Sequence, residues 1–575
     1  MAGTRNNRKT QSLIQVALII GILIFVNIMA NIRIGGRSFY SYLDLTEEKR
    51  FSLTDGTEKL LADLNDEIFV EVLLDGEFPA GFKRLQTAVR DMLEDFRSES
   101  GYIEYSFIDP GQGSVKQINE RRESLAKEGI IPISLRLKDA SSTSNQLVYP
   151  YAIFRYGNKS WTVNLLENEV PGMSNEIILN NSIGLLEYKF ASAIEKVRNS
   201  EVPTIVFTTG HGELEPIETA DLEKTLRESN ETGRINLDSV VTIGKEADLL
   251  IVAKPQTAFS DKDKFKIDQF VMNGGKVLWF LDQIAVTLDS LQRRDKFFPN
   301  PYDLKLDDLL FRYGIRIQSN LLLDIQCTKI PLATGYVGNA PQLDYFRYPY
   351  HLVVTPRIDH PIVKSVGPVN MFYTSSLDTD VETKYNVKKT VLLTTSDKSR
   401  YQRLPIAMDF DFLRYDLDPA KFDKGPQPVA MLVEGKFNSL YENRVSEEML
   451  SSLSSLGIQF KPEIENNQMI VVSDGDVIKN QVKRDGQTYS PLGWNDFEKY
   501  RFANKELIIN MIEYLLDDKG LIAARGKDVK LRLMDTTRAQ EESQQWQLIN
   551  IVVPLVFLSL FGLGYNWFRR RKYGR

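Results

Sequence analysis

The pattern of apolar and polar positions divides the chain into a long mixed body and two apolar ends. Residues 547–568 contain no charged side chain, and about 20 apolar residues span a hydrocarbon core of roughly 30 Å. Trp546, Tyr565 and Trp567 lie at the ends of this run and are of types that favour the headgroup level of a bilayer. The pattern predicts a transmembrane helix, in which Pro554 is tolerated as a kink.

A basic cluster lies between each apolar run and the nearest end of the chain. Residues 569–575 carry five positive charges and no acid, and residues 1–12 carry three and no acid. Because such clusters stay in the cytoplasm, we expect both ends to be cytoplasmic tails. The N-terminal apolar run, 13–32, begins like a signal peptide but exceeds the usual core of about 7–15 residues and lacks a clear cleavage site. We therefore favour an uncleaved transmembrane helix, with a cleaved signal as the alternative.

The first part of the body, residues 36–200, mixes strand and helix patterns. Ile68 to Leu74 alternates and is β-branched, as in a strand, whereas the apolar residues between Phe82 and Phe96 recur at helical spacing. Further strands are expected at 102–108, 146–156 and 159–165, and further helices at 115–128 and 187–198. The order β-α-β-α-β-β-α predicts a thioredoxin-like extracytoplasmic domain. Without a CxxC pair it would have no redox role, and we interpret it as a spacer or interaction module.

The second part, residues 201–527, alternates short apolar strands with helices. Residues 204–208 form an apolar run typical of a buried parallel strand, and they lead into a Gly-His-Gly-Glu turn. Strand and helix patterns then alternate up to an amphipathic helix at 504–516, and residues 528–546 form a polar stalk. This alternation predicts a doubly wound α/β domain with insertions.

Five residues of this domain form a candidate ligand pocket. Gly210, His211 and Glu213 follow the first strand, while Asp282 and Asp474 follow two later strands. In doubly wound sheets, ligands bind beyond the carboxyl ends of the strands. The alternative is a tight strand-to-helix turn, in which the glycines supply free dihedral angles and the histidine caps a neighbour.

Residues 329–360 do not fit the alternation. They are rich in Tyr, Pro and Gly, which predicts a long ordered loop. Its aromatic side chains either form an interaction surface or pack on the edge of the sheet.

Composition removes several classes of function. The one cysteine, Cys327, excludes a disulfide framework and a zinc–thiolate cluster, and the three histidines are scattered, so no metal site and no catalytic set are expected. The whole chain has a net charge of −6, so the body between the two basic ends carries −14, which argues against nucleic-acid binding. The chain has no GxxxxGK[ST] motif and cannot hydrolyse ATP through a P-loop.

Four segments taken together carry a resemblance that runs from end to end. They are FSLTDGTEKLL, IVFTTGHGELE, NKELIINMIEYLLDDKGLIAARGKDVKLRLMD and the tail WQLINIVVPLVFLSLFGLGYNWFRRRKYG. In this order they resemble the GldG family of gliding-motility-associated ABC transporter auxiliary proteins of Bacteroidetes, often labelled substrate-binding. The resemblance implies that the α/β domain has a degenerate amidotransferase-like or flavodoxin-like fold, and it supplies no catalytic residues.

The resemblance also implies partners and a location. We expect a non-enzymatic accessory subunit without cofactor, beside a separate ABC ATPase and an ABC-2 type permease in the inner membrane, with its bulk in the periplasm facing gliding and secretion proteins of the envelope. One alternative is a periplasmic subunit that binds a small molecule or glycan in the candidate pocket. A weaker one is an envelope hydrolase using His211 and Glu213, which no nucleophile accompanies.

Overall fold

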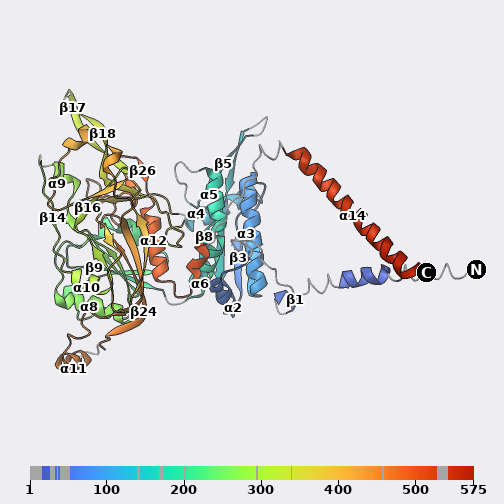
Figure 1. Cartoon of the computed structure of the whole chain (residues 1–575), viewed down its shortest axis with the longest axis horizontal. Helices are drawn as coiled ribbons and strands as arrows, with labels where there is room; N and C mark the ends of the chain where they lie inside the picture. The colour runs from blue at the N-terminus through green and yellow to red at the C-terminus, as the bar shows by residue number, and fades with distance from the viewer. Residues whose placement is uncertain are drawn as a thin grey trace, which may run out of the picture. The chain divides into compact units, whose positions relative to one another are not determined.

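The structure is a computed structural model, and it divides into two compact units, residues 1–527 and 528–575, each considered by itself. It describes residues 14, 16–25, 33–34, 37–38, 52–138, 143–167, 174–199, 202–292, 296–338, 340–364, 366–455, 459–526 and 542–574. Helices and strands are interspersed along the first unit, so the mixed α/β class expected from the sequence is confirmed (Figure 1).

The first domain, residues 52–199, contains a four-stranded sheet. Its strands, in order across the sheet, are β4 (Ile103–Phe107), β3 (Ile68–Val72), β7 (Tyr151–Tyr156) and β8 (Lys159–Asn164). β3 and β4 are parallel, and the other two pairs are antiparallel. The thioredoxin-like assignment of this domain stays a prediction.

Helices bury one face of that sheet. The alternating residues Ile68, Val70 and Val72 are fully buried, because α3 (Ala80–Glu99) turns the apolar stripe predicted from its spacing toward them. The other helices are α2 (Asp55–Ala62), α4 (Val115–Lys127), α5 (Asn175–Gly184) and α6 (Leu186–Arg198).

The strand predicted over 146–156 is wrong, because the structure contains two strands there. β6 (Thr143–Val148) pairs with β5 (Ile133–Lys138) in a separate hairpin, and β7 begins only at Tyr151. Pro150 lies between them and has no backbone N–H to donate to a ladder, so one continuous strand is interrupted at this position.

The second domain, residues 202–516, is built on a seven-stranded sheet. In order across the sheet the strands are β10 (Glu231–Asn236), β9 (Thr204–Thr209), β11 (Leu249–Ala253), β12 (Lys276–Phe280), β24 (Glu463–Val472), β23 (Pro428–Asn438) and β21 (Lys388–Thr394). The first five are mutually parallel, and the last two add antiparallel pairs at one edge.

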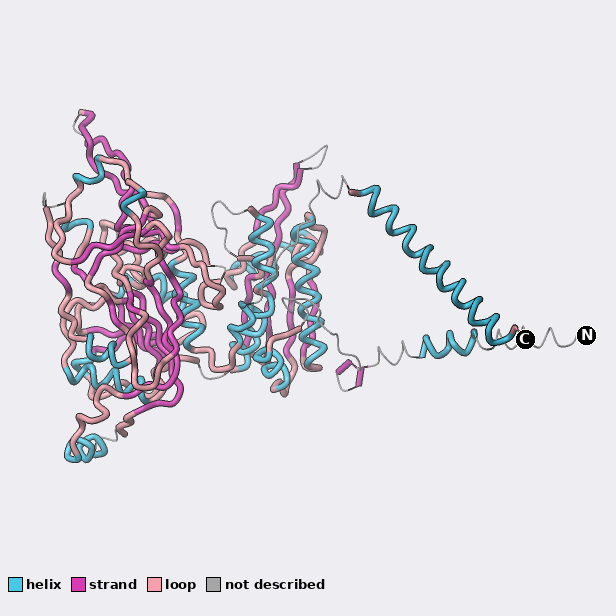
Figure 2. The backbone as a smooth tube through the Cα atoms, in the orientation of Figure 1, coloured by secondary structure: helices cyan, strands magenta, loops and turns pink. Residues whose placement is uncertain are grey.

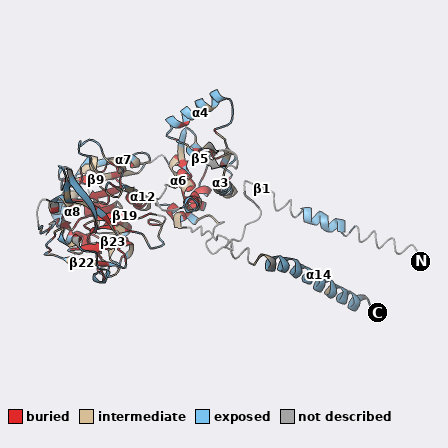
Figure 3. Ribbon diagram, turned by 90° about the horizontal axis from the view of Figure 1, so that it is seen from above, coloured by how far each residue is buried: buried red, intermediate tan, exposed pale blue. Residues whose placement is uncertain are grey.

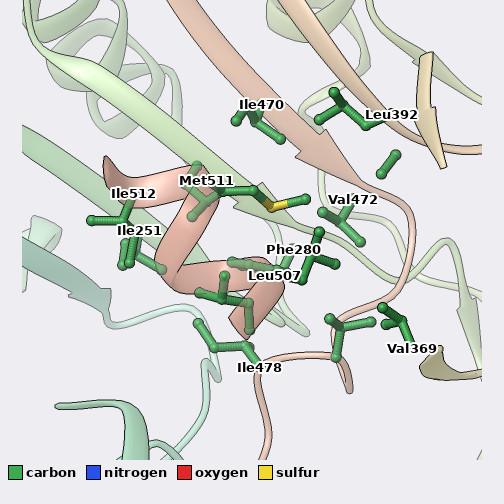
Figure 4. Packing of buried hydrophobic residues seen from close by; sticks show 14 of the residues in the cluster. Ile251, Phe280, Val369, Leu392, Ile470, Val472, Ile478, Leu507, Met511 and Ile512 are labelled. Carbon is green, nitrogen blue, oxygen red and sulfur yellow. The ribbon is translucent and has the colours of Figure 1, made fainter. Parts of the chain in front are cut away.

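Helices cover both faces of this sheet, so its central strands are buried on both sides. α7 (Ala220–Leu226) and α12 (Asn504–Leu515) pack on one face, where Leu507 and Met511 lie against Ile251 and Phe280 (Figure 4). α8 (Asp261–Met272) and α10 (Asp307–Arg312) pack on the other face with Trp279. Such two-sided burial explains why the strands read as continuous apolar runs in the sequence.

The chain between β12 and β24 inserts a subdomain with its own core. The long loop predicted at 329–360 is wrong, because β17 (Cys327–Val337) and β18 (Ala340–Val354) form a long hairpin that Figure 2 shows extending from the domain. Tyr348 and Tyr350 of β18 are buried in the subdomain core, whereas Tyr345, nearer the hairpin tip, is exposed.

The C-terminal unit contains helix α14 (Ser543–Tyr573). An 18-residue window within its segment Gln545–Lys572 has a mean hydropathy of 2.1 and is not buried by protein (Figure 3). The helix is therefore long and apolar enough to cross a membrane. Near the N-terminus, Val16–Phe25 is a shorter apolar helix. Most of the rest of the N-terminal anchor expected at 13–32 lies outside the described residues.

Candidate functional site

The candidate residues lie in loops at the carboxyl edge of the parallel strands of the second domain. β10 lies on one side of β9 and β11 on the other, so the direction of winding reverses between β9 and β11. Ligands of open α/β sheets bind in the crevice at such a reversal. Here the backbone N–H groups of Gln256 and Thr257 donate to the carbonyl oxygen of His211 at 2.8 and 3.0 Å. The chain's own loops therefore bridge this crevice.

The loop after β9 requires both of its glycines. Gly210 has a φ of +111° and Gly212 a φ of +73°, which side chains disfavour. A Cβ on Gly210 would also lie 2.9 Å from the side-chain oxygen of Asn236, and one on Gly212 would lie 3.2 Å from Cβ of Gln256. The loop can turn this tightly only because neither residue has a side chain.

His211 is buried between a phenyl ring and two carboxylates. Its ring stacks on Phe259, with centroids 3.8 Å apart. Nε2 lies 3.4 Å from Oδ2 of Asp263, and Nδ1 lies 3.6 Å from Oε1 of Glu213. The other oxygen of Glu213 accepts the backbone N–H of His211 at 2.6 Å. His211 thus fills the crevice as a packed and charge-paired side chain.

The charges around His211 favour its protonated form. Burial by itself would lower the pKa of His211, but Glu213 and Asp263 raise it above its ordinary value. Burial likewise opposes ionisation of the two acids, yet His211 lowers the pKa of Glu213, and Lys266 and Ser260 lower that of Asp263. A histidine whose protonated form is favoured in this way is less available as a general base.

Asp282 and Asp474 belong to a second buried group, centred on Lys254. Nζ of Lys254 lies 3.1 Å from Oδ2 of Asp282 and 2.5 Å from Oδ1 of Asp476. The other oxygen of Asp282 accepts the N–H of Gly475 at 2.6 Å. Asp474 accepts the N–H of Asp476 at 2.7 Å and also the N–H of Phe372 in β19 (Val369–Phe372). These bonds fasten the sheet edge to the inserted subdomain.

In the group around Lys254, the ammonium and the neighbouring carboxylates offset each other's charge. Burial would lower the pKa of Lys254, but Asp282 and Asp476 raise it, so the ammonium stays charged at neutral pH. Burial raises the pKa of Asp474 well above its usual range, and the carboxylates of Asp282 and Asp476 add to this. In Asp476, the charge of Lys254 overcomes burial and lowers the pKa. The ammonium occupies the space between the carboxylates where a bound cation would lie.

The five candidate residues thus fall into two ion-paired groups, and ligand binding by them stays a prediction. Sequence reasoning missed Lys254, Asp263 and Asp476, although each had a weak signal. Lys254 follows directly after the apolar run at 249–253, and Asp476 lies two residues beyond Asp474. Asp263 is on the first turn of α8, and only the fold brings it to His211.

Two hollows lie elsewhere on the described surface. One, of about 930 Å³, lies at the amino ends of the strands and is lined by residues including Trp161, Lys196, Lys276 and Glu513. The other, of about 880 Å³, is lined by residues including Gln283, Arg316 and Arg403. Neither contains any of the five candidate residues, so these hollows are separate from the strand-end groups.

The chemistry available to the described residues is limited. Burial raises the pKa of Cys327 to about 11, so its thiol stays protonated at neutral pH. Within the ranges that the structure describes, no three His, Cys, Asp or Glu residues are arranged to hold a metal ion.

Comparison with sequence-family profiles identifies the family to which the chain belongs. Residues 202–511 match the profile of a family described as an ABC-type uncharacterized transport system. The chain belongs to this ABC transport-system family. Residues 47–155, at the N-terminal side, match a second profile, described as a domain of unknown function, DUF7088. The match to the ABC transport-system family covers nearly all of the second domain, including both strand-end groups.

Solved structures give weaker similarities to this member of the ABC transport-system family. The N-terminal domain of mmIFT52 is 14% identical, with 55% of this chain and 97% of that chain covered and a TM-score of 0.30. A ThuA-like protein from Parabacteroides merdae ATCC 43184 is 10% identical, with 58% and 94% covered and a TM-score of 0.26. At such TM-scores neither similarity supports an argument. No curated protein matches the chain.

Proposed function

We propose that the chain is a non-enzymatic, membrane-anchored accessory subunit of an ABC-2 type transporter complex of the GldG type, which serves bacterial gliding motility. The observation that carries the proposal is the match of the second domain to the ABC transport-system family. Because the sequence has no P-loop, ATP hydrolysis falls to a separate ATPase subunit. A separate permease would provide the path through the membrane.

The membrane attachment is part of this proposal. The apolar helix α14 ends in Arg570, Arg571 and Lys572, and basic residues of this kind stay in the cytoplasm. Together with the apolar run at 13–32, α14 would hold both ends in the inner membrane and leave the two domains in the periplasm. There they would meet gliding or secretion proteins of the envelope.

The strand-end groups support a non-enzymatic role over the alternatives. His211 is paired with two carboxylates, and Lys254 fills the space between Asp282 and Asp476. A small molecule or glycan would have to displace these paired side chains before it could bind there. A hydrolase would need an unprotonated base, and Glu213 and Asp263 disfavour the unprotonated form of His211.

Purification of the full chain in mild detergent, with intact-mass analysis of every recovered chain, tests the accessory role. We expect an ABC ATPase and a multi-span permease at fixed ratio, and an intact N-terminus on this chain. A matched variant that ends before residue 542 should lose them. Recovery of this chain alone, lacking its first thirty or so residues, would contradict the two-anchor proposal.

The motility assignment needs a separate measurement. Deletion of the gene should abolish surface spreading, and the full-length gene should restore it. Recovery of the transporter subunits from a strain whose spreading survives the deletion would refute the gliding role while leaving the accessory role intact.

A further inference from the structure

The chain leaves the folded body from the first domain, although the second domain precedes the exit in the sequence. After α12, residues 517–526 turn back and their helix η5 (Leu521–Gly526) packs on α6 and α2 of the first domain. Leu521 is only 6% exposed and belongs to the hydrophobic core of the first domain. We call residues 517–526 the return segment. Figures 1 and 3 show α12 beside α6, where this joint lies.

A partly buried ionic group holds the joint between α6 and the end of α12. Glu513 of α12 accepts the hydroxyl hydrogen of Tyr188 at 2.5 Å and lies 3.6 Å from Lys196. Arg525 of the return segment lies 3.7 Å from Glu513 and covers the ring of Tyr188, with its guanidinium carbon 4.4 Å from the ring centre. A charge pair of this kind weakens as more water reaches it.

The return segment is held by its own turn, by the first domain and by the second domain, where Lys364 donates to the carbonyl oxygen of Gly526 and Arg525 donates to Asn510 of α12. Asp517 accepts the N–H groups of Leu521 and Ile522 at 3.0 and 2.7 Å, which shapes the turn. Lys519 forms a partly exposed pair with Glu195 of α6 at 2.6 Å. By contrast, α12 is buried against the sheet through residues such as Leu507 and Met511. The contacts of the short η5 turn are therefore easier to break than those of α12.

The start of the folded body docks on the same helix. The backbone N–H and the hydroxyl of Thr54 both donate to Glu187 at the first turn of α6, at 2.7 and 2.9 Å. The two chain ends that lead toward the apolar helices are thus both attached to α6. A pull between them therefore loads the contacts that hold the return segment to α6.

From this geometry we propose that the return segment is a mechanical latch. Tension on the C-terminal membrane helix peels residues 517–526 from α6, breaks the Glu513–Tyr188–Arg525 group and frees the second domain to swing about the remaining connection near residue 200. The source of the tension rests on the proposed transporter role, whereas the latch is a property of the chain alone. Peeling would also widen the 930 Å³ hollow, because Tyr188, Glu513 and Leu521 line it.

Single-molecule pulling tests the latch without any transporter subunit. The full chain is held in detergent with Cys327→Ala, and handles are attached at Ser52→Cys and Glu542→Cys. Ten residues add at most roughly 35 Å of contour length. We expect a first, low-force step of that order, before the unfolding of either domain. A first step of whole-domain length would overturn the proposal.

Matched variants assign the step to its residues. The double substitution Leu521→Asp and Ile522→Asp should abolish the first step, since the segment can no longer dock. Met449→Asp with Leu450→Asp adds the same charge at exposed apolar positions of α11 (Glu447–Ser455) and should preserve it. Persistence of the step in the first variant would refute the latch.

A cross-link covers the case in which the first variant fails to fold. In the same Cys327→Ala background with handles attached through other chemistry, Glu195→Cys and Lys519→Cys are joined by a bismaleimide with a spacer of roughly 10 Å, a length that suits the reach of the two side chains that they replace. The cross-link should remove the low-force step and leave domain unfolding unchanged. A step that survives complete cross-linking would contradict the proposal.

Discussion

The backbone of Gly56 lies directly against that of Gly520. A Cβ on Gly56 would sit 2.8 Å from the carbonyl oxygen of Gly520, so the first helix of the folded body touches the last turn before the chain leaves it. Gly56→Ala should therefore destabilise the first domain by about 1–3 kcal/mol, as overpacking does, although alanine favours helix. The drop in the first domain's melting temperature measures this.

Gly81→Ala is the matched control for that substitution. Gly81 also lies in the first turn of a helix, α3, but its Cβ would meet only the end of the flexible Leu179 side chain, at 2.7 Å. We expect a smaller effect. Equal destabilisation by both substitutions would show that the Gly56–Gly520 contact is not the cause.

His211 should make the second domain less stable as pH rises. Its folded pKa lies above the ordinary value, so its stabilising charge is fully present below about pH 6.5 and is lost as the pH rises through the folded pKa. His211→Gln should remove this dependence and cost about 3 kcal/mol near pH 6, since it leaves buried acids uncompensated. Urea unfolding of the full chain from pH 5 to 9 measures both. An unchanged pH profile in the variant would contradict the assignment.

His351 should affect the pH dependence of stability in the opposite direction, so that stability rises with pH. Burial lowers its pKa to about 3, so the unfolded chain takes up a proton below about pH 6.5 and the folded chain does not. Stability should fall by about 2 kcal/mol between pH 6.5 and 5 on this account. His351→Phe fits a site already lined by Tyr348 and Phe372 and should remove that fall. A variant that retains the full acid sensitivity would show that other groups cause it.

Lys254→Met should be among the most damaging single changes. It removes the ammonium between Asp282 and Asp476 and leaves these buried carboxylates without their cationic partner, at a cost of about 3–5 kcal/mol. Acidic buffer should restore part of the stability by protonating them. Lys245→Met, at an exposed position, is the control, and equal unfolding midpoints for the two variants would contradict the role of Lys254.

Cys327 should alkylate slowly. Burial raises the pKa of its thiol to about 11, against about 8.5 for a free cysteine, so its thiolate fraction near pH 8 is roughly a hundredfold smaller. Mass analysis after iodoacetamide treatment should show little modification in the folded chain and rapid modification in urea. Equal rates in both would contradict the raised pKa of this thiol.

The sequence pattern predicted those helices and strands whose formation depends on residues close together in the sequence. The apolar run expected at 204–208 is β9, and the helix expected at 504–516 is α12, with ends within one residue, because strand burial and helix periodicity are written in consecutive residues. The hairpin of β17 and β18 was missed, since its Tyr, Pro and Gly content hides the alternation of a strand. Its pairing depends on tertiary contacts that propensity does not record.

In the candidate site, too, local sequence predicted some features, whereas others depend on tertiary contacts. The carboxyl-edge rule located His211, Asp282 and Asp474 at strand ends. It could not show that Lys254 would neutralise two of the acids or that Asp263 would approach His211 from another helix. Those contacts depend on side-chain packing across the sheet, which the order of residues in the sequence does not record.

The place of Leu521 in the core of the first domain also sets an order of events during synthesis. The ribosome makes the first domain early, but the core of that domain is complete only after Leu521 has been synthesised. Until then its helices and sheet have an unfilled site, and long-range contacts of this kind slow folding. The newborn chain should therefore depend on chaperones for longer than its domain order suggests, and fragments ending before residue 521 should be degraded.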